Sequence, residues 1–86
     1  MLNDNARTKP TKRPALRFKS GADAKALRLK LGLNQSEFWS RLDVTQSGGS
    51  RYESGRDIPK PVMLLLHMVY GTEKQALTLL GSLRRN

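Results

Sequence analysis

Hydrophobic positions recur every three or four residues along most of the chain, which is the spacing of one apolar face on an α-helix. Ala24, Leu27 and Leu31 follow this spacing and predict a first helix with that face turned inward. The stretch Ser20-Gly-Ala-Asp23 resembles a capping box, and Gly32 suits the left-handed position that closes a helix. The pattern therefore predicts a helix that begins after Ser20 and ends at Leu31.

A second, short helix is predicted directly afterwards. Asn34-Gln-Ser-Glu37 has the form of another capping box, with Asn34 as the cap and Glu37 at the third helical position. A helix of about eight residues from this point would bury Phe38 and Leu42, with Trp39 beside them. Asp43-Val44 is then the turn that ends it.

A third helix is predicted from Gln46 to Ser54, with Thr45 as its N-cap and Gly55 closing it. Gly48 and Gly49 lie inside it, and each costs roughly 1 kcal/mol relative to alanine in a helix. The glycines are compatible with incomplete helical order in the free chain, or with close approach of the backbone to a ligand. Packing from a neighbouring helix is the third interpretation.

Two further helices complete the pattern. Residues 61–70 are nearly all apolar after Pro61, which fits the first turn of a helix, and Gly71 ends the run. Thr72-Glu-Lys-Gln75 is a third capping box and opens a helix that extends to about Arg85. With no alternating strand pattern in the sequence, the chain is predicted to be all-α, with five helices.

The first 19 residues have a different composition. They contain two prolines and six Lys or Arg against a single Asp, so they carry about half of the net charge of +9. Such a segment is typical of disorder. The predicted organisation is a basic disordered arm over residues 1–19 and one helical domain over residues 20–86. The arm either follows phosphates or a minor groove, or is a solvated leader without a specific contact.

Length and charge narrow the function. Eighty-six residues suffice for one small domain, and 16 Lys+Arg against 7 Asp+Glu favour a polyanionic partner, with a membrane surface as the alternative. The sequence lacks cysteine, has one histidine, and contains neither a membrane-length apolar run nor a signal peptide. We therefore expect a cytoplasmic protein without metal or cofactor. With no nucleophile–base constellation and no catalytic residues in view, we expect no enzyme activity.

The segments LRLKLGLNQSEF and VTQSGGSRYESGRDIP together resemble the helix-turn-helix domains of the phage lambda repressor and Cro type, the XRE family. The resemblance covers roughly residues 22–71. Its specific elements are Gly32-Leu33-Asn34-Gln35, Thr45-Gln46, Glu53-Ser54-Gly55 and Ile58-Pro59 with Pro61. It implies a five-helix lambda-repressor-like domain whose third helix, residues 46–54, enters the major groove of double-stranded DNA.

The resemblance and the side-chain chemistry together imply which residues contact DNA. The residues expected to read base edges are Gln46, Ser47, Ser50 and Arg51. An amide suits adenine, and a guanidinium suits guanine O6 and N7, although Arg51 has a plain phosphate contact as its alternative. The residues expected to bind phosphates are Asn34, Gln35, Thr45, Arg56 and Lys60. For Arg56 and Lys60 the alternative is a solvated surface position.

The resemblance also implies an ion pair between Arg28 and Glu53, which would orient the third helix more than it stabilises the fold. The sequence departs from the family at the seam between the second and third helices. Trp39 stands where a small residue is usual, and Gly49 where Val or Ile is usual. We interpret these as one exchange that keeps the core volume roughly constant. Asp43 replaces the usual turn glycine.

The fourth helix carries more apolar residues than one buried face needs. The candidates for a two-fold interface are Leu64, Leu65, Met68, Leu80 and Leu83; alternatively, the fifth helix covers them within one monomer. His67 on the same helix is expected to be a packed side chain and not a ligand.

The predicted function is that of a sequence-specific transcriptional regulator, a repressor, that binds an inverted-repeat operator in the nucleoid as a homodimer. One alternative is the antitoxin of a toxin–antitoxin pair, with a toxin protein as partner. Another is a protein-interaction adaptor on the same fold. An RNA-binding function is less favoured because the sequence has few aromatic residues to stack on unpaired bases.

Overall fold

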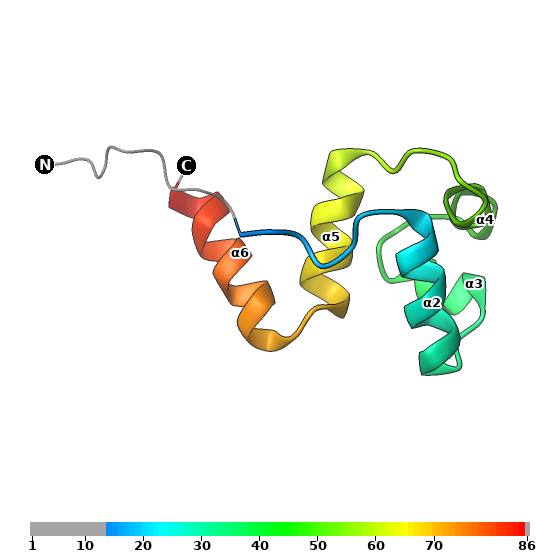
Figure 1. The fold of residues 1–86 in the computed structure, drawn as a ribbon, viewed down its shortest axis with the longest axis horizontal. Helices are drawn as coiled ribbons and strands as arrows, with labels where there is room; N and C mark the ends of the chain where they lie inside the picture. The colour runs from blue at the N-terminus through cyan, green and yellow to red at the C-terminus, as the bar shows by residue number, and fades with distance from the viewer. Residues whose placement is uncertain (1–13, 86) are drawn as a thin grey trace, which may run out of the picture.

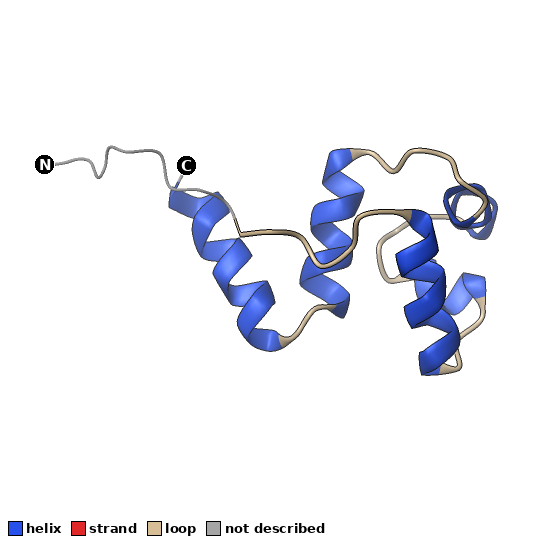
Figure 2. Cartoon of the chain, in the orientation of Figure 1, coloured by secondary structure: helices blue, strands red, loops and turns tan. Residues whose placement is uncertain are grey.

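The computed structural model describes residues 14–85, and this part of the chain consists of helices joined by short connections, with no strand (Figure 1, Figure 2). The helices are α2 (Gly21–Leu31), α3 (Gln35–Ser40), α4 (Gln46–Glu53), α5 (Lys60–Tyr70) and α6 (Glu73–Arg85). The prediction of an all-α chain with five helices is therefore confirmed for the described residues. α3 has six residues instead of about eight, and α5 begins at Lys60, one residue before the predicted start.

Side chains cap the helices where the sequence predicts. Asn34 and Glu37 form a complete capping box at α3, and the Thr45 hydroxyl accepts a hydrogen bond from the Gly48 N–H at the start of α4. At α2 the Ser20 hydroxyl accepts from the Asp23 N–H, but the Asp23 carboxylate accepts from the N–H of Lys19 and not of Ser20. The predicted caps are thus confirmed. At α2, however, the Asp23 side chain bonds the backbone one residue before the N-cap.

Two sharp reversals bring α2, α3 and α4 together. Gly32 closes α2 with a φ of 72°, and Asp43 adopts a φ of 59° in the turn between α3 and α4. A positive φ costs free energy for any residue with a Cβ, although Asp tolerates it better than most. Both reversals lie where the sequence predicts them, and the backbone at Asp43 is strained relative to a glycine in the same conformation.

The core lies where α2, α3, α4 and α5 meet, whereas α6 packs mainly against α5 and extends to the side (Figure 1). Phe38 and Tyr70 stack with ring centroids 4.1 Å apart, and the Tyr70 hydroxyl donates a 2.6 Å hydrogen bond to the Phe38 carbonyl. This bond satisfies a polar group that would otherwise be buried without a partner. α5 is thereby joined to the helix that precedes the turn.

The core begins earlier in the chain than predicted. Phe18 is 2% exposed and belongs to the core cluster, although the sequence had assigned it to a disordered arm. The Arg17 backbone N–H donates to Nδ1 of His67, and the Arg17 guanidinium donates to the Tyr70 carbonyl. The boundary at residue 20 is therefore wrong for residues 17 and 18, because composition cannot show that one aromatic ring finds a pocket. Residues 1–13 of the predicted arm lie outside the described residues.

The inner face of α2 also differs from the prediction. Gly21, Ala24 and Arg28 are its buried residues, while Leu27 is half-buried and Leu31 is 49% exposed. The helix turns toward α4, where a small residue permits contact between backbones and Arg28 reaches a carboxylate. The expectation that Leu31 is buried is therefore wrong: a polar contact of Arg28, and not the leucine spacing, sets the orientation of the helix.

Gly21 permits the closest backbone contact between α2 and α4. A Cβ at this position would lie 1.8 Å from the Tyr52 carbonyl oxygen, so Gly21→Ala requires the two helices to separate. We expect this substitution to lower the free energy of unfolding by about 2–3 kcal/mol, as for other overpacked sites. Urea or thermal unfolding followed by circular dichroism measures the change.

Gly81 in α6 provides a matched control for this prediction. A Cβ there would approach only the end of the flexible Arg85 side chain, at 3.1 Å. Gly81→Ala is therefore expected to stabilise the chain, by up to about 1 kcal/mol, through its helix propensity. A Gly21→Ala variant as stable as the Gly81→Ala variant would contradict the close contact of α2 with α4.

His67 is a packed residue, as expected, and it connects three segments. It is 1% exposed; Nδ1 accepts from the Arg17 N–H at 2.9 Å, and Nε2 lies 3.3 Å from the Gln75 carbonyl. Since a carbonyl only accepts, the tautomer with the proton on Nε2 satisfies both contacts. His67 thus holds the segment before α2 and the start of α6 against α5.

Candidate nucleic-acid interface

The outer side of α4 presents polar side chains to solvent. Gln46, Ser47 and Arg51 are exposed, and Ser50 is half-buried. All four lie on the helix that follows the α3–α4 turn, within five residues of its N-terminus. The structure therefore places together the side chains that the sequence predicted to read bases.

Below this surface, Arg28 and Glu53 form the predicted pair between α2 and α4. The Arg28 Nε donates to Glu53 Oε2 at 2.9 Å and its Nη2 donates to Oε1 at 3.0 Å, while Nη1 donates to the Leu33 carbonyl. The two side chains are 11% and 3% exposed. A bidentate pair of this kind fixes both the distance and the plane of the two groups. It therefore sets how α4 lies on α2.

Two further donors converge on the same carboxylate. The Trp39 Nε1–H donates to Glu53 Oε2 at 2.8 Å, and the Gln35 Nε2 donates to Oε1 at 3.2 Å. Burial by itself raises the pKa of the Glu53 carboxyl, but the hydrogen bonds from Arg28, Trp39 and Gln35 and the charge of Arg28 outweigh it and hold the pKa below its ordinary value. Glu53 is consequently an acceptor only, at neutral pH.

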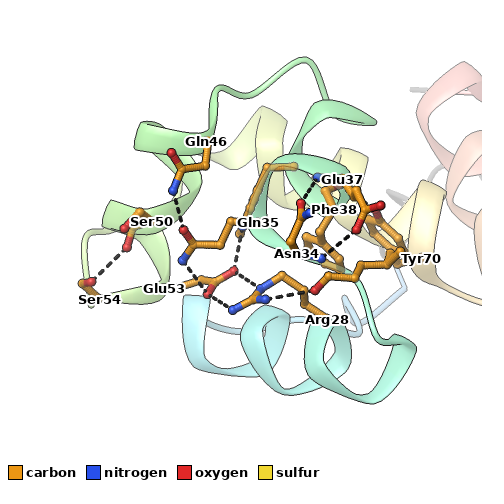
Figure 3. A network of polar contacts seen from close by, with 12 residues as sticks. Arg28, Asn34, Gln35, Glu37, Phe38, Gln46, Ser50, Glu53, Ser54 and Tyr70 are labelled. Carbon is orange, nitrogen blue, oxygen red and sulfur yellow. Dashed lines mark hydrogen bonds and ion pairs between the residues drawn. The ribbon is translucent and has the colours of Figure 1, made fainter.

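A chain of amide hydrogen bonds leads from Glu53 to the surface (Figure 3). The Gln46 Nε2 donates to Gln35 Oε1 at 2.8 Å, and the Gln35 Nε2 in turn donates to Glu53. Because the carboxylate cannot donate, Gln35 must direct its amino group toward Glu53 and its oxygen toward Gln46. The orientation of both amides is therefore determined by the charge at the inner end of the chain.

This orientation leaves Gln46 with specific free groups. One amino hydrogen is used by Gln35, so one N–H and the Oε1 acceptor remain at the exposed N-terminal end of α4. One donor beside one acceptor is the pattern that pairs with N7 and N6–H of adenine. The geometry is thus suited to reading a base edge in the major groove.

A family model for the RsaL-like HTH domain matches residues 25–69, which is just over half of the chain and contains α3, the turn and α4 complete. The chain belongs to the RsaL-like HTH domain family. It therefore carries a helix-turn-helix DNA-binding domain. The narrower resemblance to lambda repressor and Cro domains stays a prediction. No curated protein and no solved structure gives a significant match to the chain.

The residues of the RsaL-like domain that are predicted to bind phosphate differ in exposure and in whether their side chains already make hydrogen bonds. Asn34 and Thr45 are exposed, and each uses its side-chain oxygen to cap a helix. Arg56 is exposed in the loop after α4, and Lys60 is exposed in the first turn of α5, not in the loop. Gln35 is half-buried, and both ends of its amide are engaged. Its role in the amide chain was not foreseen, because sequence spacing does not show which amides meet.

At the seam between α3 and α4 of the RsaL-like domain, the Trp39 ring packs directly against Gly49. The indole is 0% exposed, and a Cβ on Gly49 would lie 2.2 Å from its Cδ1. The ring thus occupies the volume that a side chain at residue 49 would fill. Of the three interpretations of the two glycines, packing by Trp39 accounts for Gly49. The indole N–H bond to Glu53 was missed, although an indole next to a buried carboxylate could have suggested it.

The residues predicted to form a dimer interface are only partly exposed to solvent. Leu65 and Leu80 are each 40% exposed, while Leu64, Met68 and Leu83 are half-buried. Val69 and Leu77 on the same two helices are also exposed, at 41% and 59%, and were not predicted.

Within residues 14–85, no helix combines the length and apolar character that a membrane crossing needs.

Proposed function

We propose that the chain is a sequence-specific transcriptional regulator of the lambda repressor and Cro type, which represses by occupying its operator. The observation that carries the proposal is the fixed amide of Gln46 at the exposed start of α4, with one donor and one acceptor free. A domain that bound DNA only through phosphates would not need a side chain oriented in this way, since phosphate contacts carry no sequence information.

Arg51 complements Gln46 in this proposal. It is exposed on the same helix, five residues further on, and its guanidinium can pair with guanine O6 and N7. Arg56 and Lys60 lie beyond the end of α4 and supply positive charge for the backbone of the same duplex. The proposed contact surface therefore has base-reading groups along α4 and phosphate-binding groups beside them.

The proposal is tested by selecting binding sites from a random DNA pool and footprinting the enriched sequences. We expect enrichment of a short motif that contains an adenine and a guanine within one major-groove face. Retention of the pool without enrichment of any motif would show non-specific binding and would overturn the proposal.

Arg51→Ala is expected to weaken binding to the selected site by about 1–3 kcal/mol while leaving binding to unrelated DNA nearly unchanged. The physical reason is that a base contact is lost and the phosphate contacts remain. Arg56→Ala is the matched control, because it removes one exposed cation from the adjacent loop. It should weaken binding to all DNA sequences alike. It should also reduce the slope of log affinity against log salt concentration by about 0.9. Equal loss on all sequences for Arg51→Ala would make Arg51 a phosphate contact.

We further propose that the regulator binds as a homodimer through α5 and α6. Leu65 and Leu80 present apolar surface on two helices that pack against each other, and a symmetric operator needs two copies of α4. We expect sedimentation to show a dimer and the selected motif to be an inverted repeat.

A double substitution, Leu65→Lys with Leu80→Lys, is expected to give a folded monomer that binds the operator at least tenfold more weakly, because the two half-sites no longer act together. Leu29→Lys is the matched control, since Leu29 is 59% exposed but lies on α2. A Leu65→Lys/Leu80→Lys chain that sediments as the wild type would place the interface elsewhere.

A further inference from the structure

The Trp39 indole is held in one orientation by contacts on all sides. Its ring lies edge-on to Phe38 with centroids 5.2 Å apart and tilted against Tyr52 at 5.6 Å, and Gly49 lies against its face. Its single polar group, Nε1–H, donates to Glu53 at 2.8 Å. The ring therefore acts as a fixed donor whose direction the core determines.

The indole bond differs from the other bonds to Glu53 in what it restrains. Arg28 donates to both carboxylate oxygens and so fixes the plane of the carboxylate as a whole. The indole has two torsions, both set by packing, and it contacts Oε2 alone. By holding Oε2, the indole leaves Oε1 as the oxygen that faces Gln35.

The position of Oε1 is transmitted to the DNA-facing surface. Gln35 takes its amide orientation from Oε1, and Gln46 takes its orientation from Gln35. A side chain already held in its binding orientation loses less conformational entropy when it meets its partner. Trp39 is fully buried and cannot touch DNA itself, but it stands at the inner end of this chain.

We propose that Trp39 is a positioning residue for base recognition: its indole N–H anchors the Glu53 carboxylate, which through Gln35 holds the Gln46 amide ready for an adenine edge. This inference deepens the proposed function and rests on it. It also gives the exchange of Trp39 for Gly49 a function beyond volume, because an aliphatic seam would fill the space without supplying a hydrogen-bond donor.

Trp39→Phe is the direct test, since it keeps an aromatic ring and removes the N–H. We expect discrimination at the base pair read by Gln46 to fall about tenfold on the selected DNA site, with binding to unrelated DNA unchanged. Leu79→Ala is the matched control for loss of core packing, because Leu79 is equally buried but lies on α6, which packs mainly against α5 and not against the helices of the amide chain. It should lower stability and leave discrimination intact.

A double-mutant cycle separates positioning from general damage. In a Gln46→Ala background, Trp39→Phe should cause no further loss of discrimination, because the residue through which it acts is absent. Undiminished discrimination in Trp39→Phe would overturn the inference. So would an equal loss with and without Gln46.

The free protein offers a readout that needs no DNA. Trp39 is the one tryptophan of the chain, so its indole proton gives a single NMR signal. We expect this signal and the carboxyl carbon of Glu53 to shift together as the pH is lowered below the ordinary carboxyl range, in wild type and in Gln46→Ala. If the indole signal does not shift with the carboxyl carbon of Glu53, the indole N–H does not bond this carboxylate, and the inference is overturned.

Failure of the inference and failure of the proposed function give different results. A wild-type chain that enriches no DNA motif overturns both, whatever the NMR titration shows. Enrichment of a motif, followed by unchanged discrimination in Trp39→Phe, overturns the positioning role of Trp39 alone.

Discussion

Replacing Trp39 with alanine is expected to lower the free energy of unfolding by about 3–5 kcal/mol, the range for removal of a fully buried large aromatic side chain. The indole is 0% exposed and packs against Phe38 and Tyr52, so its loss leaves a cavity at the seam of α3 and α4. The opposite wall is Gly49, which has no side chain to move into that space. Chemical unfolding followed by circular dichroism measures the change.

A second prediction compares Gly49→Ala in the wild type with the same substitution in Trp39→Ala. In the wild type, Gly49→Ala is expected to destabilise, because overpacking costs roughly 1–3 kcal/mol and helix propensity returns only about 1. In Trp39→Ala the same change should stabilise, because the clash is gone and the added methyl group fills part of the cavity. Gly48→Ala, whose Cβ comes no closer than 3.3 Å to its neighbours, should have the same effect in both backgrounds. A Gly49→Ala effect that does not change sign would contradict the exchange.

Glu53→Ala is the second large effect, with an expected loss of about 3–5 kcal/mol. The substitution leaves the Arg28 guanidinium buried without its carboxylate and also removes the acceptor of Trp39 and Gln35. An uncompensated buried charge costs far more than the pair contributed. Thermal and urea unfolding measure the loss of stability, and operator binding should fall with it because Gln35 and Gln46 lose their orientation.

Replacing both Arg28 and Glu53 separates the effect of the ion pair on the orientation of α4 from its effect on stability. Arg28→Met with Glu53→Leu should cost less stability than Glu53→Ala alone and still weaken discrimination among DNA sites. Because the pKa of Glu53 is lower in the folded chain, its charged form stabilises the fold at pH above about 4.3, and this contribution is lost as the pH falls through the folded pKa. The double variant should lack that acid-dependent loss. A double variant less stable than Glu53→Ala would mean that the ion pair itself supports the fold.

Local chemistry predicted most of the helical framework. Four of the helix starts have a side-chain cap within three residues, and Thr45 and Asn34 cap as their positions suggest, whereas α5 has no side-chain cap and carries Pro61 in its first turn. The reversals at Gly32 and Asp43 were likewise predictable, since few residue types tolerate a positive φ. The pairing of Arg28 with Glu53 came from the resemblance and is present. Base contact by Gln46 and Arg51 and assembly into a dimer stay predictions.

Contacts between distant segments could not be predicted in this way. Phe18 follows a proline-rich basic stretch, and nothing in its neighbours indicates that it fills a core site to which residues as distant in sequence as Tyr70 contribute. Leu31 keeps the apolar spacing of α2 but lies exposed, because Arg28 turns the helix toward α4. The close backbone contact at Gly21, where a Cβ would lie 1.8 Å from the Tyr52 carbonyl oxygen, depends on the same packing.

By itself, the sequence determined the five helices, their caps, the turn between α3 and α4 and the residues presented along α4, because these depend on interactions within a few positions of each other. Only the tertiary structure decided that Trp39 donates to Glu53 and that Gln35 joins Glu53 to Gln46. These bonds depend on the distance and angle at which α3 and α4 pack. Side-chain packing over the whole domain sets those quantities, and no short stretch of the chain contains them.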